Sequence, residues 1–298
     1  MSLKDNALLL SDISHIKYLS PKYDLVFKAL FTKNKSLLRS FLTSVLDLNI
    51  ENDEDIVISN NEQVLNPNGG KKHYLDLIVN IKRNNKRSVV NIEIQLSPCK
   101  DLHKRFLYYT ASVYANSIVN GESYSNIPAV ISLNILDFVL FNEKAYYHNA
   151  YALKNVLDND IYPDSFYMHF IELPKLVQSK KIGEIINTLD ENTCLNDLWL
   201  LLFKCETTEE FEELSTKNQT IKNAIDQLHD ISQNQDTRWA YMLEQRKIKD
   251  YESDMYDNFE MGLEKGIDKV AKKMKNDNVD YVLISKYSGL SIEEIEAL

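Results

Sequence analysis

The chain has 298 residues, 44% of them hydrophobic, which is enough apolar material for the core of one large domain or of one domain with a helical appendage. Its net charge of −10 counts against a domain that is basic throughout, as many nucleic-acid-binding domains are. No run of about eighteen apolar residues is present, so we expect no membrane-spanning helix. The first residues lack the apolar core of a signal peptide, which favours the cytoplasm.

Cysteines and histidines do not indicate a disulfide framework or a zinc site. The three cysteines (Cys99, Cys194 and Cys205) are scattered and odd in number, so we expect free thiols in a reducing compartment. The six histidines show no zinc-ligand spacing.

The first predicted element is a helix that begins at Ser20-Pro21, a capping hydroxyl followed by proline. Its buried stripe consists of Val26, Phe27, Leu30 and Phe31. Asp24 and Lys28 share the other face, where their spacing fits a surface ion pair. A second helix is expected over 37–46 and a strand over 56–58.

The stretches 74–81 and 89–96 both alternate apolar and polar residues, the pattern of strands with one face in a core. The polar connection between them is centred on Asn84-Asn85, a pair that tolerates the left-handed backbone of a tight hairpin turn. A turn symmetric about this pair brings Leu77 opposite Ile92, and the other inward aliphatic residues follow the same register.

This register also sets two acidic residues side by side on the other face of the hairpin. Asp76 faces Glu93, and Gln95 lies beside them. A slip of one residue would turn one strand's aliphatic side chains out of the core, so the hydrophobic pattern itself specifies this register. Facing carboxylates are unfavourable unless a cation neutralises them, and hard oxygen ligands suit Mg²⁺ or Mn²⁺. We therefore expect a divalent-metal site here.

Basic residues gather around the hairpin and on a helix predicted over 101–119. The side chains that we expect to contact nucleic-acid phosphates are Lys28, Lys82, Arg83, Lys86, Arg87 and Arg105. A locally positive region on an acidic chain fits weak, salt-sensitive phosphate binding. Alternatively, the basic residues at the turn only keep a sheet edge soluble, and the stem of Arg105 only covers apolar surface.

A strand predicted over 129–135 completes an α/β core, and strands over 146–153 and 166–173 extend its sheet. Glu172, at the end of the last of these strands, is expected to be structural. From Ile182 onward the pattern is helical. The predicted organisation is a lead-in (1–19), a core (20–178), a helical region (179–260) and a C-terminal helical segment (261–298).

The C-terminal segment predicts two short helices separated by Gly289, with Ser291 and Glu294 forming a capping box for the second. It is either half of a helix-turn-helix or an element for protein contact or dimerisation. Before it, Gly262-Leu263-Glu264-Lys265-Gly266 favours a flexible stretch.

Several motifs resemble a known family. An Asp on one strand followed by Glu-x-Gln on the next resembles the PD-(D/E)XK nuclease signature. The motifs that resemble the Rpn group of recombination-promoting nucleases and transposases are Asp24-x-x-Phe27-Lys28-x-x-Phe31, Arg105 with Tyr108-Tyr109, Gly121-x-x-Tyr124 followed by Pro128, Ile171-Glu172-Leu173-Pro174-Lys175, and Gly289-Leu290-Ser291-Ile292-Glu293-Glu294-Ile295. The resemblance runs from about Ser20 to the end of the chain.

The resemblance implies a restriction-endonuclease-like αβββαβ core with a mixed sheet, followed by a mainly helical region. It also implies magnesium-dependent cutting of DNA in bacteria, linked to recombination or transposition. Asp76, Glu93 and the main-chain oxygen of Ile94 would bind the metal, and Gln95 would hold the place of the family's lysine. Asp24 would be the acid that the family keeps on its first core helix.

The chain departs from the family signature at two positions. Leu75 replaces a proline that has no chemical role, and Gln95 cannot supply the positive charge of the lysine. Lys28 and Arg105 are the candidates to supply it instead. We therefore expect a DNA endonuclease with little sequence specificity, which could work as a homodimer. The alternatives are a weak or inactive DNA-binding protein on the same fold, or a protein-interaction scaffold.

Overall fold

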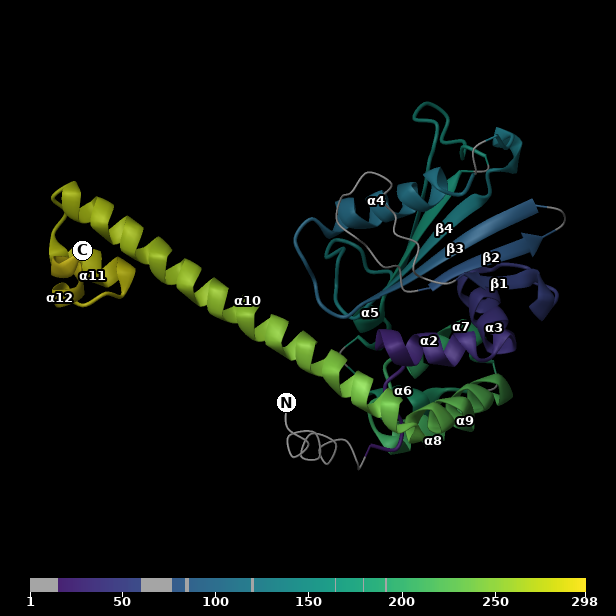
Figure 1. Cartoon of the computed structure of the whole chain (residues 1–298). Helices are drawn as coiled ribbons and strands as arrows, with labels where there is room; N and C mark the ends of the chain where they lie inside the picture. The colour runs from purple at the N-terminus through teal and green to yellow at the C-terminus, as the bar shows by residue number, and fades with distance from the viewer. Residues whose placement is uncertain are drawn as a thin grey trace. The chain divides into compact units, whose positions relative to one another are not determined.

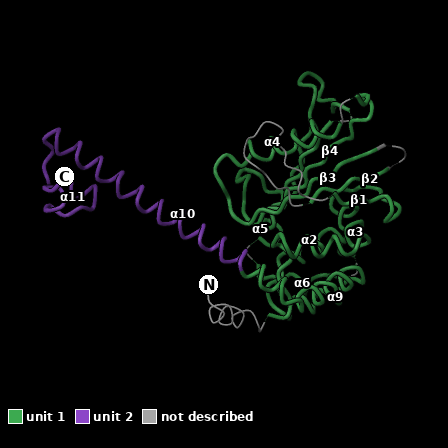
Figure 2. The backbone as a smooth tube through the Cα atoms, viewed as in Figure 1, with its two compact units in different colours: residues 1–242 green, residues 243–298 purple. Residues whose placement is uncertain are grey.

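The computed structural model describes residues 16–59, 77–83, 86–118, 121–163, 165–178, 180–190 and 192–298. Its contacts divide the chain into two compact units, residues 1–242 and 243–298, which Figure 2 colours separately. The four segments expected from the sequence remain predictions. Within the described ranges, no helix is long and apolar enough to cross a membrane.

A six-stranded mixed sheet forms the centre of the first unit (Figure 1). Its strands are β1 (Ile56–Ser59), β2 (Leu77–Arg83), β3 (Lys86–Gln95), β4 (Ala129–Leu136), β5 (His148–Ala152) and β6 (Phe166–Glu172). In space they follow the order β1-β2-β3-β4-β6-β5. β3, β4 and β6 run parallel, whereas β1, β2 and β5 pair antiparallel with their neighbours. With helices before β1 and between β3 and β4, this order confirms the predicted αβββαβ core.

The β2–β3 pairing has the register that the hydrophobic alternation predicted. Leu77 lies opposite Ile92 and Val79 opposite Val90, and all four side chains are buried in one core. The register is determined by burial, because a shift of one residue would move these aliphatic side chains to the other face. The residues at the Asn84-Asn85 turn, and Leu75 and Asp76 before β2, lie outside the described part of the chain.

Helices cover both faces of the sheet (Figure 1). One face packs on α2 (Asp24–Thr32), α3 (Lys35–Leu46) and α7 (Leu195–Leu202), and the other face is covered by α4 (Leu102–Ala115). A further layer, beyond α2 and α3, is formed by α6 (Ile182–Thr188), α8 (Thr208–Ser215) and α9 (Gln219–Gln233). The short helix α5 (Leu173–Val177) directly follows β6. The helical region thus shares one hydrophobic core with the sheet.

An aromatic cluster holds the α2, α3 and α7 layer together. Trp199 is fully buried, with its ring 5.7 Å from both Phe31 and Phe41, and its indole nitrogen lies 3.3 Å from the Ser40 hydroxyl oxygen. Buried aromatic side chains of this size contribute several kcal/mol each, about 3–5 when they are truncated. This cluster fixes the position of α2 against the sheet.

Helix α2 begins later than the sequence suggested. Its N-cap is Tyr23, not Ser20. Ser20 instead accepts a 3.4 Å hydrogen bond from the Tyr23 amide, so residues 20–23 form a turn before the helix. The predicted buried stripe of α2 is confirmed.

The second unit consists of the C-terminal part of α10 (Gln235–Asn276) together with α11 (Tyr281–Ser288) and α12 (Ile292–Ala297). The three helices meet around Ala271, Ile284 and Ile295, which are all fully buried. Gly289 ends α11 with a φ of 78°, and the predicted capping box of Ser291 and Glu294 is present. The stretch 262–266, expected to be flexible, is instead an interior part of α10.

Candidate active site

A row of buried polar residues crosses the face of the sheet that α4 covers. Asn91 and Glu93 on β3 alternate with the aliphatic residues that face α2, and so do Ser132 and Asn134 on β4. Glu93 is only 7% exposed, and the other three side chains are at most 1% exposed. Since an unpaired buried polar group costs free energy, this row must be hydrogen-bonded or serve a ligand.

The parallel pairing of β3 and β4 brings the row together. Glu93 lies beside Asn134, and the amide of Asn91 is 3.5 Å from Glu93 Oε1. Asn134 donates to the Ser132 hydroxyl at 3.1 Å and to the His169 main-chain oxygen at 3.0 Å. The Asn91 side-chain oxygen is buried and has no hydrogen-bond partner among the described residues. Two hard oxygen donors, a carboxylate and an amide oxygen, therefore lie on one stretch of β3.

Gln95 continues this row to the end of β3 and contacts α4. Its side-chain oxygen accepts a hydrogen bond from Arg105, and its amide donates to the Ser97 main-chain oxygen at 3.0 Å. Arg105 also donates to Cys99 Sγ at 3.3 Å, and its guanidinium lies 5.7 Å from the centre of the Tyr109 ring. These contacts hold the Arg105 guanidinium next to Gln95, the residue expected to take the place of the lysine in the PD-(D/E)XK signature.

The second predicted metal ligand, Asp76, lies outside the described residues. Among the residues that are described, no three His, Cys, Asp or Glu side chains come together as a metal site. The oxygen donors of Glu93 and Asn91 have the chemistry that Mg²⁺ or Mn²⁺ requires. The Ile94 side chain packs on the opposite, apolar face, so this residue can offer only its main-chain oxygen.

Asp24 and Lys28 form the i,i+4 ion pair that their spacing suggested, with 2.7 Å between Lys28 Nζ and Asp24 Oδ2. The pair is partly exposed, so its contribution to stability is small, about 0–1 kcal/mol. Asp24 is the first residue of α2. Lys22, two residues before this helix, belongs to a cluster of charged residues that connects the start of α2 to the sheet.

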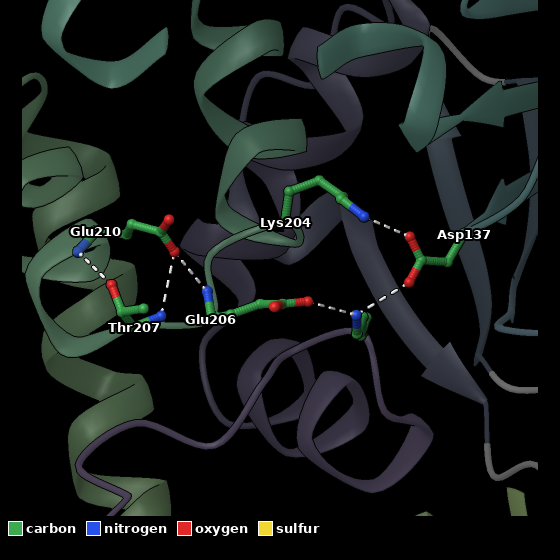
Figure 3. Close-up of polar contacts among 6 residues, drawn as sticks. Asp137, Lys204, Glu206, Thr207 and Glu210 are labelled. Atoms are coloured by element: carbon green, nitrogen blue, oxygen red, sulfur yellow. Dashed lines mark hydrogen bonds and ion pairs between the residues drawn. The ribbon is translucent and has the colours of Figure 1, made fainter. Parts of the chain in front are cut away.

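Asp137 directly follows β4 and forms ion pairs with two lysines (Figure 3). Lys22 lies 3.0 Å and Lys204 lies 2.7 Å from its carboxylate, and Lys22 also lies 3.4 Å from Glu206. The Asp137 amide donates to the Gln95 main-chain oxygen at 3.0 Å. The cluster therefore ties the residues just before α2 to the carboxyl ends of β3 and β4.

Burial lowers the pKa of Lys22, but the attraction and hydrogen bond of Asp137 outweigh it, so the pKa of this lysine is raised overall. Lys22 therefore stays charged at neutral pH. The sequence analysis missed this cluster, because its members are 67 to 184 residues apart in the chain. The one available signal was an acidic residue at the carboxyl end of a predicted parallel strand, an edge where ligands commonly bind.

The basic residues of the hairpin lie at its turn end. Lys82 pairs with Arg87 across the two strands and both are exposed, whereas Arg83 and Lys86 are described only as a backbone pair. Arg87 is six residues from Glu93 along β3, which corresponds to about 20 Å at the rise of a strand. These side chains are therefore remote from Glu93.

Glu172 is a second buried acid on the α4 face, and its described contacts join it to main-chain amides and to neighbouring side chains. It is fully buried and accepts hydrogen bonds from the Leu140 and Phe141 amides at 2.6 and 3.0 Å. Lys175 lies 2.7 Å away as its ion-pair partner. Its exclusion from the predicted site stays a prediction.

Comparison with known proteins identifies the family. The model of the PD-(D/E)XK nuclease family transposases matches residues 21–257. Searches of curated proteins and of solved structures found no significant match. The matched range includes α2, the whole sheet and the buried polar row around Glu93. The chain therefore belongs to the PD-(D/E)XK nuclease family transposases.

Proposed function

We propose that this protein is a metal-dependent DNA endonuclease of the Rpn type, which acts in recombination or transposition. Magnesium is the proposed cofactor, with manganese as a substitute. The observation that carries the proposal is the β2–β3 register together with the buried Glu93. That register, continued by one residue beyond Leu77, would set Asp76 opposite Glu93.

In this proposal Asp76, Glu93 and the main-chain oxygen of Ile94 hold the ion. A bound divalent ion would polarise a phosphate oxygen and lower the pKa of a water molecule. The low exposure of Glu93 supports its role, because an ion held by a buried carboxylate is screened less by solvent. Asp24, the first residue of α2, is proposed as the acid that the family keeps on its first core helix, where it would act near the metal.

Gln95 and Arg105 together are proposed to replace the family's lysine. Gln95 would orient the attacking water by a hydrogen bond, and Arg105, bound to the Gln95 side-chain oxygen, would supply the positive charge. This favours Arg105 over Lys28, which is already paired with Asp24. Arg105 contacts Gln95 and not the substrate in this proposal, so it would act by its charge and by holding the Gln95 side chain in place.

The DNA itself is proposed to be held through its backbone. Lys82 and Arg87 are exposed at the hairpin end, and Arg83 and Lys86 belong to the same basic set in the sequence. Contacts to phosphates position a duplex without reading its bases, so we expect cleavage with little sequence specificity. Affinity should fall steeply with added salt.

The test is cleavage of supercoiled plasmid by the purified full chain with Mg²⁺, Mn²⁺ or Ca²⁺. We expect cleavage with the first two ions, and a loss of at least about 100-fold in Asp76→Asn and in Glu93→Gln, because each removes a charge from the metal site. Glu143→Gln, at an exposed acid of the same unit, is the matched control and should cleave normally.

Equal cleavage by the wild type and both site variants would reject the assignment. DNA binding without cleavage by any of the three ions would instead identify a binding protein on the same fold, a result consistent with the loss of the lysine at Gln95. Thermal unfolding gives an independent readout, since an ion that binds the folded state raises the melting temperature. Magnesium should raise it in the wild type and not in Glu93→Gln.

The role of Arg105 has its own experiment. Arg105→Gln should lower kcat more than it raises KM for DNA, because the charge is needed in the transition state. Adding Gln95→Lys to this variant restores the family pattern and should recover activity. If Arg105→Gln changed only KM, Arg105 would be a DNA-backbone contact instead.

A further inference from the structure

Helix α10 carries an apolar stripe that is exposed in the second unit. All residues from 249 to 266 are exposed, yet apolar residues recur every three or four positions along one side of the helix between the partly buried Ile248 and Leu263, and Val270 lies on the same side. Members of this α10 stripe are Ile248, Tyr251, Met255, Phe259, Leu263 and Val270. Met255 and Phe259 are 51% and 66% exposed. Single exposed apolar residues are common, but a continuous exposed stripe marks a contact surface.

Two glycines, Gly262 and Gly266, lie in the middle of the stripe. Glycine costs about 1 kcal/mol relative to alanine in the interior of a helix. A Cβ atom at either position would have no neighbour within 4 Å, so no contact within the described part of the chain explains this cost. Glycine would instead let another backbone approach this part of α10 closely.

An apolar groove of about 430 Å³ opens at the same place. Gly262, Gly266 and Val270 of α10 form its floor and one wall, and Tyr287 of α11 contributes to the other wall. Phe259 lies on the same stripe, just before the groove. A second copy of the chain thus offers both a groove and an exposed phenyl ring that could fill it.

The charges on α10 indicate which way a second copy would run. Between 250 and 264 the helix has six acidic residues and no basic ones: Asp250, Glu252, Asp254, Asp257, Glu260 and Glu264. Between 265 and 275 it has five lysines and a single acid: Lys265, Lys269, Lys272, Lys273, Lys275 and Asp268. A parallel pair would set the two acidic segments side by side, which is repulsive.

We propose that the second unit forms a homodimer in which two α10 helices pack antiparallel through this stripe. A twofold axis near Glu264 would set Gly262 of one copy opposite Gly266 of the other. Each acidic segment would then lie beside the partner's lysine-rich segment, and each Phe259 would enter the partner's groove. The proposal is independent of the catalytic assignment, because every residue it uses lies in the second unit.

The first test is the mass of the full chain in solution, measured by light scattering or sedimentation. We expect twice the chain mass of 34.6 kDa for the wild type. Met255→Glu combined with Phe259→Glu should give the monomer mass, because it adds charge to the centre of the contact. Both sites are exposed in the single chain, and helicity measured by circular dichroism should be unchanged. Met261→Glu, on the other side of the same helix, is the matched control and should remain dimeric.

The second test is orientation, read by disulfide cross-linking in a background carrying Cys99→Ser and Cys194→Ser. In the antiparallel pair Met255 lies near Lys273 of the other copy, whereas the two Met255 residues are about 27 Å apart along the helix axis. A Met255→Cys chain should therefore cross-link only after mixing and subunit exchange with a Lys273→Cys chain.

Three results would overturn the proposal. They are a monomeric wild type at the highest concentration measured, a dimer that survives the Met255→Glu and Phe259→Glu changes, or self-cross-linking of Met255→Cys, which indicates a parallel pair. Each concerns only association, so none bears on DNA cleavage.

Discussion

The two faces of the central sheet differ in what they bury. Toward α2, α3 and α7 the buried residues of β2, β3 and β4 are aliphatic, and they pack into one core with the aromatic cluster around Trp199. Toward α4 the same strands bury Asn91, Glu93, Ser132 and Asn134. Apolar burial stabilises a fold at about 25 cal/mol per Å², whereas a buried polar group contributes little net stability even when paired.

This difference teaches that the two faces have different roles. The apolar face supplies stability and holds α2 in place, and the polar face is where a charged group can meet a ligand away from bulk water. Residues retained at a cost to stability are candidates for function. If this interpretation is right, substitutions on the two faces should separate effects on stability from effects on activity.

The largest expected loss of stability is at the centre of the apolar face. Trp199→Ala should lower the free energy of unfolding by about 4 kcal/mol, because it leaves a cavity beside Phe31 and Phe41. Chemical denaturation of both proteins measures this loss. Tyr146→Ala, at a 77% exposed aromatic, serves as the control and should cost less than about 0.5 kcal/mol. Similar losses in the two variants would contradict the packing described here.

Asp137 tests the charged cluster at the end of β4. Asp137→Ala leaves Lys22 and Lys204, with side chains only 14% and 17% exposed, close together without the shared carboxylate. We expect a loss of about 2–4 kcal/mol in the free energy of unfolding. Asp53→Ala, which breaks a more exposed pair with Arg39, is the comparison and should cost at most about 1 kcal/mol. Equal losses in the Asp137→Ala and Asp53→Ala variants would mean that the low exposure of the Asp137 cluster does not increase its contribution to stability.

The sequence predicted the parts of the fold that depend on local pattern. Alternation along 74–81 and 89–96 fixed the register of Leu77 with Ile92, because only one register buries both strands' aliphatic residues. The capping box at Ser291 was likewise readable, since it depends on residues three positions apart. The start of α2 was misjudged because a turn at Ser20 uses the same residue types as a helix cap.

The site was only partly predictable, for a different physical reason. Glu93 and Gln95 could be selected from their strand, but the partner of Gln95 on α4 and the lysines on Asp137 depend on packing between distant segments. The sequence also did not predict that the asparagines are buried. A strand alternates apolar and polar residues in the same way whether its polar face is covered by a helix or exposed to solvent. Asp76, the other acid of the prediction, lies outside the described residues.

The free energy of unfolding should depend on pH through His148 on β5 and His169 on β6. His148 Nε2 and His169 Nδ1 lie 2.9 Å apart. Burial, and then the charge of His148, lowers the pKa of His169 to about 4. The unfolded chain therefore takes up this proton at a higher pH than the folded one. The contribution of His169 to the free energy of unfolding is fully present above the ordinary pKa of about 6.5 and is lost as pH falls toward 4. The loss is about 2 kcal/mol after allowance for partial exposure.

Denaturation of the wild type between pH 7 and about pH 4 measures this loss. His169→Phe removes the titrating group and should flatten the dependence over that range. His103→Gln, which removes an exposed imidazole, is the matched control and should keep the wild-type slope. A variant at His169 with an unchanged slope would assign the acid sensitivity to other groups.

Only a small change in stability is expected at Glu93, where we expect the largest change in activity. Glu93→Gln keeps the shape of the side chain and an oxygen that can accept from Asn91, while it removes the cost of burying a charge. The free energy of unfolding without added metal should change by less than about 1 kcal/mol. Either no change or an increase agrees with a functional role of the Glu93 carboxylate. A loss comparable to that of Trp199→Ala would show that Glu93 stabilises the fold, and the division of labour between the two faces would then be wrong. Loss of cleavage at unchanged stability is the combination that only a functional carboxylate gives, because a structural acid cannot be removed from a buried position at no cost.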